Sequence, residues 1–209
     1  FWQDHGPRHA SVHKLDIYNG QFNDKRIAGA PISYATFLAN KEGELKAVYG
    51  RDRNNKTQLF IMDNEEWQQI SSANFSQEIK PIAINEQGTL LLTLDTFKQE
   101  RTGLFQLNLA NGKYENIFTD EKSNIATVEV NKNNKEVYAL RFDDETSTYL
   151  TVGKSSVESE IHKSLLNIFS GKQVSIVSKS ANDETFVVKV GSGKFYIYSK
   201  LSNKLSALN

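Results

Sequence analysis

The sequence contains no cysteine among its 209 residues. This absence excludes disulfide frameworks, zinc–thiolate sites and cysteine nucleophiles, and it is compatible with both the cytoplasm and the periplasm. Long hydrophobic runs are also lacking, since none approaches the roughly 18 residues that a membrane-spanning helix requires. We therefore expect no membrane span, and the localisation stays open between these two compartments.

An excess of charge of either sign is missing as well. The chain has 25 Lys and Arg residues against 25 Asp and Glu residues, for a formal net charge of zero. Binding of a nucleic-acid duplex requires a clustered positive face, so this balance argues against nucleic acid as a partner. The chain begins with Phe1 and Trp2 and shows no signal-like segment, so we expect a piece of a longer protein.

Short runs of aromatic and β-branched residues are abundant, and Asn, Gly, Asp and Lys separate them, which is typical of strands joined by tight turns. The pattern repeats along the chain at intervals of roughly 45 residues. The predicted turns contain the asparagines Asn19, Asn64, Asn111 and Asn203. The strand before each turn position carries an aromatic residue in the later units, namely Phe60, Phe105, Tyr149 and Phe195.

Four short strands per repeat of this length are typical of a β-propeller. We predict an all-β chain, a β-propeller fragment of about four to five four-stranded antiparallel blades forming one partial domain over 1–209. The expected units are 1–30, 31–74, 75–121, 122–171 and 172–209. A two-sheet sandwich is less favoured, because it would show cleaner alternation and no fixed period. The first unit lacks its innermost strand, so exposed end blades predict a homo-oligomer.

One segment interrupts the strand pattern where the fourth unit should supply its last strand. Val157, Ile161, Leu165 and Ile168 recur at helical spacing, which predicts one short helix at 156–169. Ser155 with Glu158 is expected to form a capping box, and Gly171 suits a left-handed stop. We expect His162, inside this helix, to be a partly exposed side chain without a ligand.

The segment from Ile161 to Asn209, which begins "IHKSLLNIFSG", resembles the last propeller blade of bacterial prolyl oligopeptidase-family serine peptidases of the dipeptidyl or acylaminoacyl peptidase type. "DHGPRHASVHKLDIYNG" resembles a mid-propeller hairpin of the same family. The family joins its propeller to a C-terminal α/β-hydrolase domain that carries a Ser-Asp-His triad, with the serine on a G-x-S-x-G turn. This chain has no G-x-S-x-G, so no catalytic residue is transferred to it.

The resemblance implies that the chain is the non-catalytic propeller portion of a serine peptidase. In that role it limits and positions peptide substrates for a hydrolase domain of the same parent protein, and the chain alone is not an enzyme. No catalytic, cofactor-binding or metal-binding residue is assigned. The family usually has a longer loop where this chain has only Gly191–Gly193, a link that suits a tight hairpin and has also the composition of an engineered linker.

Two other functions stay open from the sequence. The chain is alternatively a free-standing propeller that serves as a protein–protein interaction module. A third hypothesis is a metal or small-ligand module built on His5, His9 and His13, although Pro7 disfavours a helix that would align them. The charged runs "RFDDET" and "GRDRNNK" are interpreted as solvated turns at corresponding places of two units.

Overall fold

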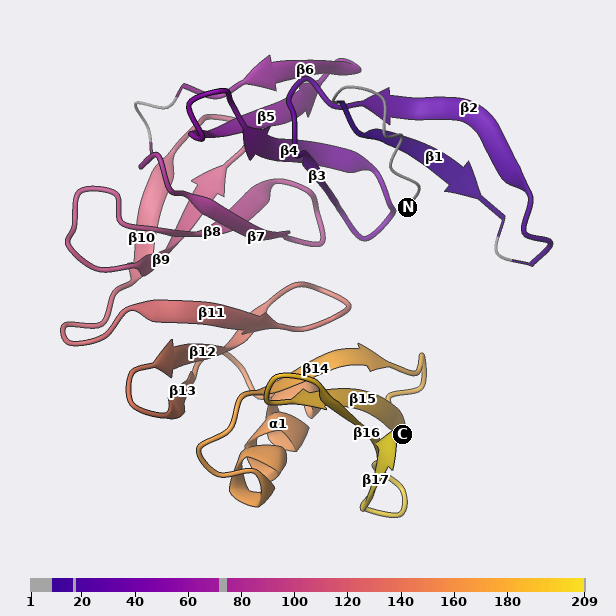
Figure 1. The fold of residues 1–209 in the computed structure, drawn as a ribbon, viewed down its shortest axis with the longest axis vertical. Helices are drawn as coiled ribbons and strands as arrows, with labels where there is room; N and C mark the ends of the chain where they lie inside the picture. Colours follow the sequence, from indigo (N-terminus) through magenta and orange to yellow (C-terminus); the bar gives the residue numbers. More distant parts are fainter. Residues whose placement is uncertain (1–8, 17, 72–74, 209) are drawn as a thin grey trace. The chain divides into compact units, whose positions relative to one another are not determined.

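The computed structural model describes residues 9–16, 18–71 and 75–208 (Figure 1). In these residues the chain forms five antiparallel sheets and one short helix. The first sheet pairs β1 (Ser11–Leu15) with β2 (Phe22–Gly29), and the second contains β3 (Thr36–Ala39), β4 (Leu45–Arg51), β5 (Thr57–Asp63) and β6 (Glu66–Gln69).

The remaining three sheets follow in chain order. The third contains β7 (Lys80–Ile84), β8 (Leu90–Asp95), β9 (Gly103–Asn108) and β10 (Tyr114–Phe118). The fourth contains β11 (Ile125–Val130), β12 (Val137–Asp143) and β13 (Ser147–Thr151). The fifth contains β14 (Val174–Lys179), β15 (Thr185–Val190), β16 (Lys194–Ser199) and β17 (Lys204–Leu208). In every sheet each strand pairs with its neighbours in the sequence, which is the blade pattern of a β-propeller.

The predicted fold class is confirmed: the chain is all-β, a β-propeller fragment with one short helix near 156–169. The repeated turns lie where the asparagine spacing placed them. Asn64 and Asn203 adopt left-handed backbone angles, with φ of 47° and 50°, between the third and fourth strands of their sheets. Asparagine tolerates this conformation better than other non-glycine residues, which explains its recurrence there.

The fourth sheet has no fourth strand among the described residues, and the helix α1 (Val157–Ile168) follows β13 instead. Its predicted N-cap was wrong by one residue. Ser156, not Ser155, is the N-cap: its hydroxyl accepts the backbone N–H of Ser159 at 3.2 Å, and its own backbone N–H donates to the Ser159 hydroxyl at 3.0 Å. Gly171 beyond the helix has a φ of 71°, as expected of a left-handed stop. No helix in the described part of the chain is long and apolar enough to span a bilayer.

The chain divides into two compact units, one formed by 1–98 with 105–115 and the other by 99–104 with 116–209. The first unit has a core in which strands of the second and third sheets share buried side chains, including Ala47, Leu59, Leu91 and Leu107. Stacking of this kind removes both faces of a blade from water and accounts for the apolar second strands. That 1–209 forms a single domain stays a prediction.

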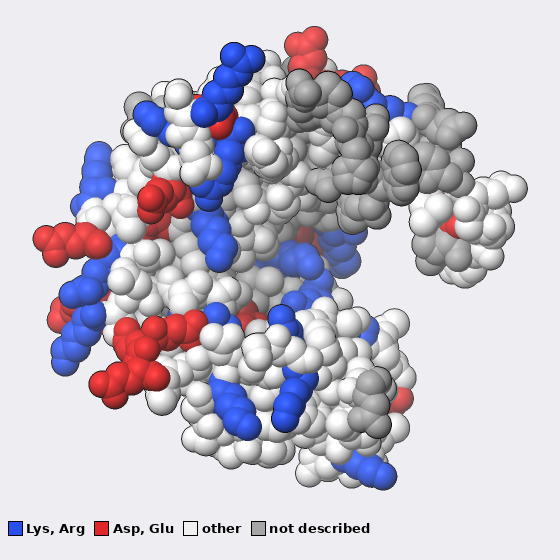
Figure 2. Space-filling model, in the orientation of Figure 1, with Lys and Arg blue, Asp and Glu red and all other residues white. Residues whose placement is uncertain are grey.

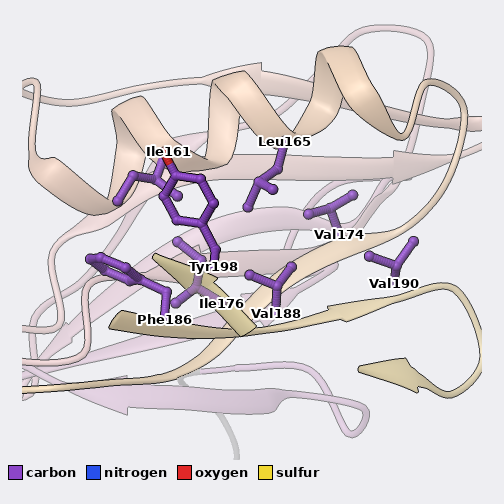
Figure 3. Packing of buried hydrophobic residues seen from close by; sticks show 8 residues of the cluster. All are labelled: Ile161, Leu165, Val174, Ile176, Phe186, Val188, Val190 and Tyr198. Atoms are coloured by element: carbon purple, nitrogen blue, oxygen red, sulfur yellow. The ribbon is translucent and has the colours of Figure 1, made fainter. Parts of the chain in front are cut away.

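The core of the second unit lies between α1 and one face of the fifth sheet (Figure 3). Ile161 and Leu165 of the helix point toward the sheet, and the sheet contributes Phe186 and Val188 from β15. Val174, Ile176, Val190 and Tyr198 complete the buried cluster. The helix therefore provides the apolar cover for this face of the last sheet.

Gly50 in β4 marks a close approach of two backbone segments. A Cβ atom at this position would overlap the carbonyl oxygen of Ser33 and would lie 2.7 Å from Cγ2 of Ile32. We expect Gly50→Ala to lower the free energy of unfolding by about 2 kcal/mol, measured by urea unfolding, since a crowded site must shift its backbone. The matched control is Gly193→Ala, whose added methyl meets no atom within 4 Å and which should be near neutral.

Candidate functional site

The candidate site is the place where the blade repeat is interrupted, in the second unit. It comprises β13, α1 and a set of buried polar side chains from β11, β12 and β14. Its histidine, tyrosine and carboxylate side chains can donate or accept protons and hydrogen bonds. The partners of these side chains therefore decide what the site can do.

Glu158 connects α1 to two neighbouring segments. Its side chain is fully buried, and its two carboxylate oxygens accept the backbone N–H of Lys132 at 3.0 and 3.1 Å. One of these oxygens also lies 3.1 Å from Nζ of Lys179, near the end of β14. A buried carboxylate is stable only with such partners, so Glu158 binds the helix to the β11–β12 turn and to the fifth sheet at once.

Lys179 completes this ionic contact. Its side chain is 7% exposed and also pairs with Asp183 at 2.6 Å. Burial opposes the ammonium charge, but the carboxylates of Asp183 and Glu158 outweigh it and hold the pKa of Lys179 above its ordinary value. The side chain therefore stays charged across the physiological range and acts as a fixed cation in the network.

His162 lies one helical turn after Glu158 and is 1% exposed, so the expectation of a partly exposed side chain was wrong. Its Nε2 is 3.0 Å from the carbonyl oxygen of Val174. A carbonyl can only accept, so Nε2 carries the hydrogen. Burial lowers the pKa of His162, and the neutral ring packs edge-on against Tyr138 and Tyr149 with centroids 5.4 and 4.9 Å away.

The two tyrosines differ in how their hydroxyl groups are used. Tyr149 accepts the N–H of Val174 at 2.8 Å and donates to the carbonyl of the same residue at 3.1 Å. The hydroxyl of Tyr138 is buried and has no hydrogen-bond partner in the described residues. Burial raises the pKa of both hydroxyls, so both remain protonated at neutral pH.

A second buried carboxylate, Glu129 of β11, lies close to these side chains. It is 6% exposed and accepts the hydroxyl of Ser175 in β14 at 2.6 Å. Burial raises the pKa of Glu129, and the Ser175 hydrogen bond opposes this rise only in part. The contact joins the first strands of the fourth and fifth sheets.

The hydrogen bonds of this network hold neighbouring segments of the chain together. His162, Tyr149 and Glu158 all direct polar atoms at the backbone of neighbouring segments, at Val174 or Lys132. Neutral His162 donates its Nε2 hydrogen to the carbonyl of Val174, and the two oxygens of Glu158 accept from Lys132 and Lys179. The arrangement fixes α1 against β14 and the β11–β12 turn.

His162 predicts a pH dependence of stability. The pKa of His162 is lowered from about 6.5 in the folded protein because the side chain is buried. Below pH 6.5 the unfolded chain therefore binds a proton at His162 more readily than the folded chain does. The stability from neutral His162 is complete above pH 6.5 and is lost as the pH falls below it. Glu129 acts in the opposite direction, since its raised pKa favours the folded state at lower pH.

Urea unfolding at pH 7 and pH 5 isolates the contribution of His162 when the parent protein is compared with a His162 variant. We expect His162→Gln to lose less stability than the parent protein between these two pH values. The control is Asn167→Gln, an exposed and uncharged position on the same helix, which should keep the parent's pH dependence. An unchanged pH dependence in His162→Gln would contradict the assignment.

The two charged runs form turns between the second and third strands of their sheets, as predicted. Asp143 pairs with Arg141 at 3.0 Å and accepts the hydroxyl of Ser147 at 2.6 Å. In the corresponding turn of the second sheet, Asp52 accepts two backbone N–H groups, and these bonds lower its pKa. Basic and acidic side chains are interspersed on the face of the protein shown in Figure 2.

Of the three N-terminal histidines, His5 lies outside the described residues. His9 contacts the carbonyl oxygen of Ala30 through Nδ1 at 2.9 Å, and His13 contacts the hydroxyl of Ser11 at 3.0 Å. Within the described ranges, no three His, Asp or Glu side chains gather in a way that would hold a metal ion. The module based on His5, His9 and His13 stays a prediction.

The link Gly191–Gly193 joins β15 to β16 as a short connection, with a left-handed φ of 60° at Gly191. Val190 and Lys194 are paired across it. This conformation suits glycine at the first position, in agreement with the tight hairpin expected there.

Comparisons with known proteins support the fold. No family model matches the chain, and no curated protein matches it. The crystal structure of TolB from Acinetobacter baumannii is similar, with a TM-score of 0.54 and 13% identity over 97% of this chain and 49% of that chain. A putative TolB from Agrobacterium tumefaciens has a TM-score of 0.49 and 10% identity over 97% of this chain and 70% of that chain.

The chain thus spans about half the length of the first TolB structure. At 13% identity the likeness shows the fold alone, a TolB-like β-propeller. It does not support the assignment to the prolyl oligopeptidase family, which rests on the sequence resemblance.

Proposed function

We propose that this chain is the non-catalytic propeller portion of a prolyl oligopeptidase-like serine peptidase. In this role it limits the access of peptides and positions them for a hydrolase domain of the same parent protein. The blade fold and the family resemblance of residues 161–209 support the proposal. The observation that carries it is the interrupted fourth sheet, where a rigidly attached helix leaves a strand position open for an extended segment.

Such a role acts through exclusion and orientation. A peptide that is held along a sheet has fewer orientations available, which favours reaction at a domain that supplies the chemistry. A propeller that covers the reacting centre also excludes water and large folded substrates. The buried polar network serves this role by keeping α1 in place while a peptide binds and leaves.

Two measurements test the proposal. The chain alone should bind peptides but should not turn over aminoacyl or proline-containing chromogenic substrates, and measurable turnover would contradict it. The coding sequence beyond Asn209 should contain a G-x-S-x-G motif in a strand–turn–helix setting. A stop codon directly after Asn209 would overturn the peptidase parentage.

A free-standing interaction propeller is the second candidate. One face of the fifth sheet favours it, because Val177, Phe195 and Leu208 are 40%, 39% and 47% exposed. Exposed apolar side chains on a sheet suit a protein partner, including a second copy bound through an end blade. Sedimentation over a concentration series tests the second copy, and Phe195→Glu should weaken any such association.

A further inference from the structure

The third strand of the fourth sheet, β13, has a free edge. Among the residues that the structure describes, it pairs only with β12, whereas β5, β9 and β16 of the four-stranded sheets each have a fourth strand on the second side. An exposed strand edge presents unpaired N–H and C=O groups that can pair with another extended segment.

The register identifies the groups on this edge. The N–H of Val152 donates to the carbonyl of Tyr138, and Leu150 and Thr148 pair with Leu140 and Phe142 in the same register. In an antiparallel ladder, hydrogen-bonded pairs alternate along the strand, so Leu150 and Thr148 direct their N–H and C=O groups toward β12. Ser147, Tyr149 and Thr151 therefore direct theirs toward the free edge.

The fourth strands of the chain indicate what fits there. β6 and β17 run antiparallel to the third strands of their sheets and have four and five residues. They place apolar side chains opposite apolar ones, as with Trp67 opposite Met62 and Leu208 opposite Phe195. On β13 the exposed apolar side chain is Leu150, at 41% exposure.

Charged side chains at the two ends of β13 predict the charges that a strand bound to its free edge would carry. The exposed acids Asp144 and Glu145 precede its first residue, and exposed Lys154 follows its last one. An antiparallel segment begins beside Thr151 and ends beside Ser147. Its first residues then lie toward Lys154 and its last residues toward the two acids, which favours an acidic start and a basic end.

We propose that β13 binds an extended peptide segment as the missing fourth strand of the fourth sheet. The segment is antiparallel to β13, about five residues long, apolar opposite Leu150, acidic at its start and basic at its end. This inference rests on the proposed peptide-binding function and names the place and the chemistry of the peptide.

The test uses a blocked probe peptide of about seven residues with glutamate first, leucine in the centre, β-branched residues around it and lysine last. Only one edge of a bound strand faces β13. N-methylation of every second residue in one phase should weaken binding at least about tenfold, and methylation in the other phase less than about threefold, in fluorescence anisotropy. Equal effects of the two phases, or no binding of the unmethylated probe, would overturn the proposal.

Variants of the protein give an independent readout. Thr151→Pro removes one edge N–H but no bond to β12, so it should weaken binding at least about fivefold, while Thr151→Val should bind normally. The charge-reversed probe should bind more weakly than the original, and Glu145→Lys combined with Lys154→Glu should reverse that preference. An unaltered preference would contradict the proposed direction.

Two outcomes distinguish a failure of the peptide site at β13 from a failure of the proposed peptidase parentage. If the probe fails to bind and the chain forms a concentration-dependent dimer that Thr151→Pro abolishes, a second copy occupies β13 and the proposal is wrong. If the probe binds as described but no hydrolase domain follows Asn209, the peptide site stands and the peptidase parentage fails.

Discussion

Replacing Glu158 with glutamine is expected to lower the free energy of unfolding by about 3 kcal/mol, because a buried ion pair loses one partner. The substitution removes the carboxylate from Lys179, whose side chain is 7% exposed and would keep only Asp183 as a counter-charge. It also weakens the hydrogen bonding that the backbone N–H of Lys132 donates to this side chain. Urea unfolding of the full chain measures the effect.

The control for this prediction is Glu160→Gln, an exposed acid on the same helix, which should change stability by less than about 0.5 kcal/mol. Glu158→Gln combined with Lys179→Met completes a double-mutant cycle. Because the second change removes the unpaired buried cation, the double variant should recover part of the lost stability. A double variant as unstable as the sum of the two single changes would show that the two side chains are not coupled.

Replacing Phe186 with alanine is expected to cost about 3–5 kcal/mol, the range for deletion of a buried aromatic side chain. Phe186 is fully buried in β15, in the cluster that it forms with Ile161 and Leu165 of α1. The loss leaves a cavity beneath the helix, so amide hydrogen exchange at 157–168 should accelerate along with the drop in unfolding free energy.

Phe195→Ala is the matched control. Phe195 lies in the neighbouring strand of the same sheet but is 39% exposed, and its truncation should cost less than about 1 kcal/mol. Similar losses for the two phenylalanines would contradict the packing of α1 on the face that contains Phe186.

Local patterns were enough to predict the repeat. Turn residues are set by backbone angles, so the left-handed positions at Asn64 and Asn203 are visible in the sequence as regularly spaced asparagines. The missing strand and its replacement by a helix were predictable for the same reason, since the spacing of Ile161 and Leu165 is a property of one segment. These features depend on neighbours along the chain.

The buried face of the helix was predicted only in part. Ile168 is 61% exposed, although the apolar spacing placed it inside, and Glu158 and His162 are buried instead. Their polar atoms are satisfied by Lys132, Lys179 and Val174, which belong to distant segments. One signal was available: Glu158, Ile161, His162 and Leu165 follow the i, i+3, i+4, i+7 spacing of a single helix face.

The order of strands within the sheets has a kinetic consequence. Each sheet is a meander, so its pairings join residues close in sequence, and such local contacts close small loops at low entropic cost and form quickly. The contacts of α1 are different, since Glu158 joins Lys132 on one side to Lys179 on the other. We therefore expect the fourth and fifth sheets to complete folding together, with docking of α1 as the step that joins them.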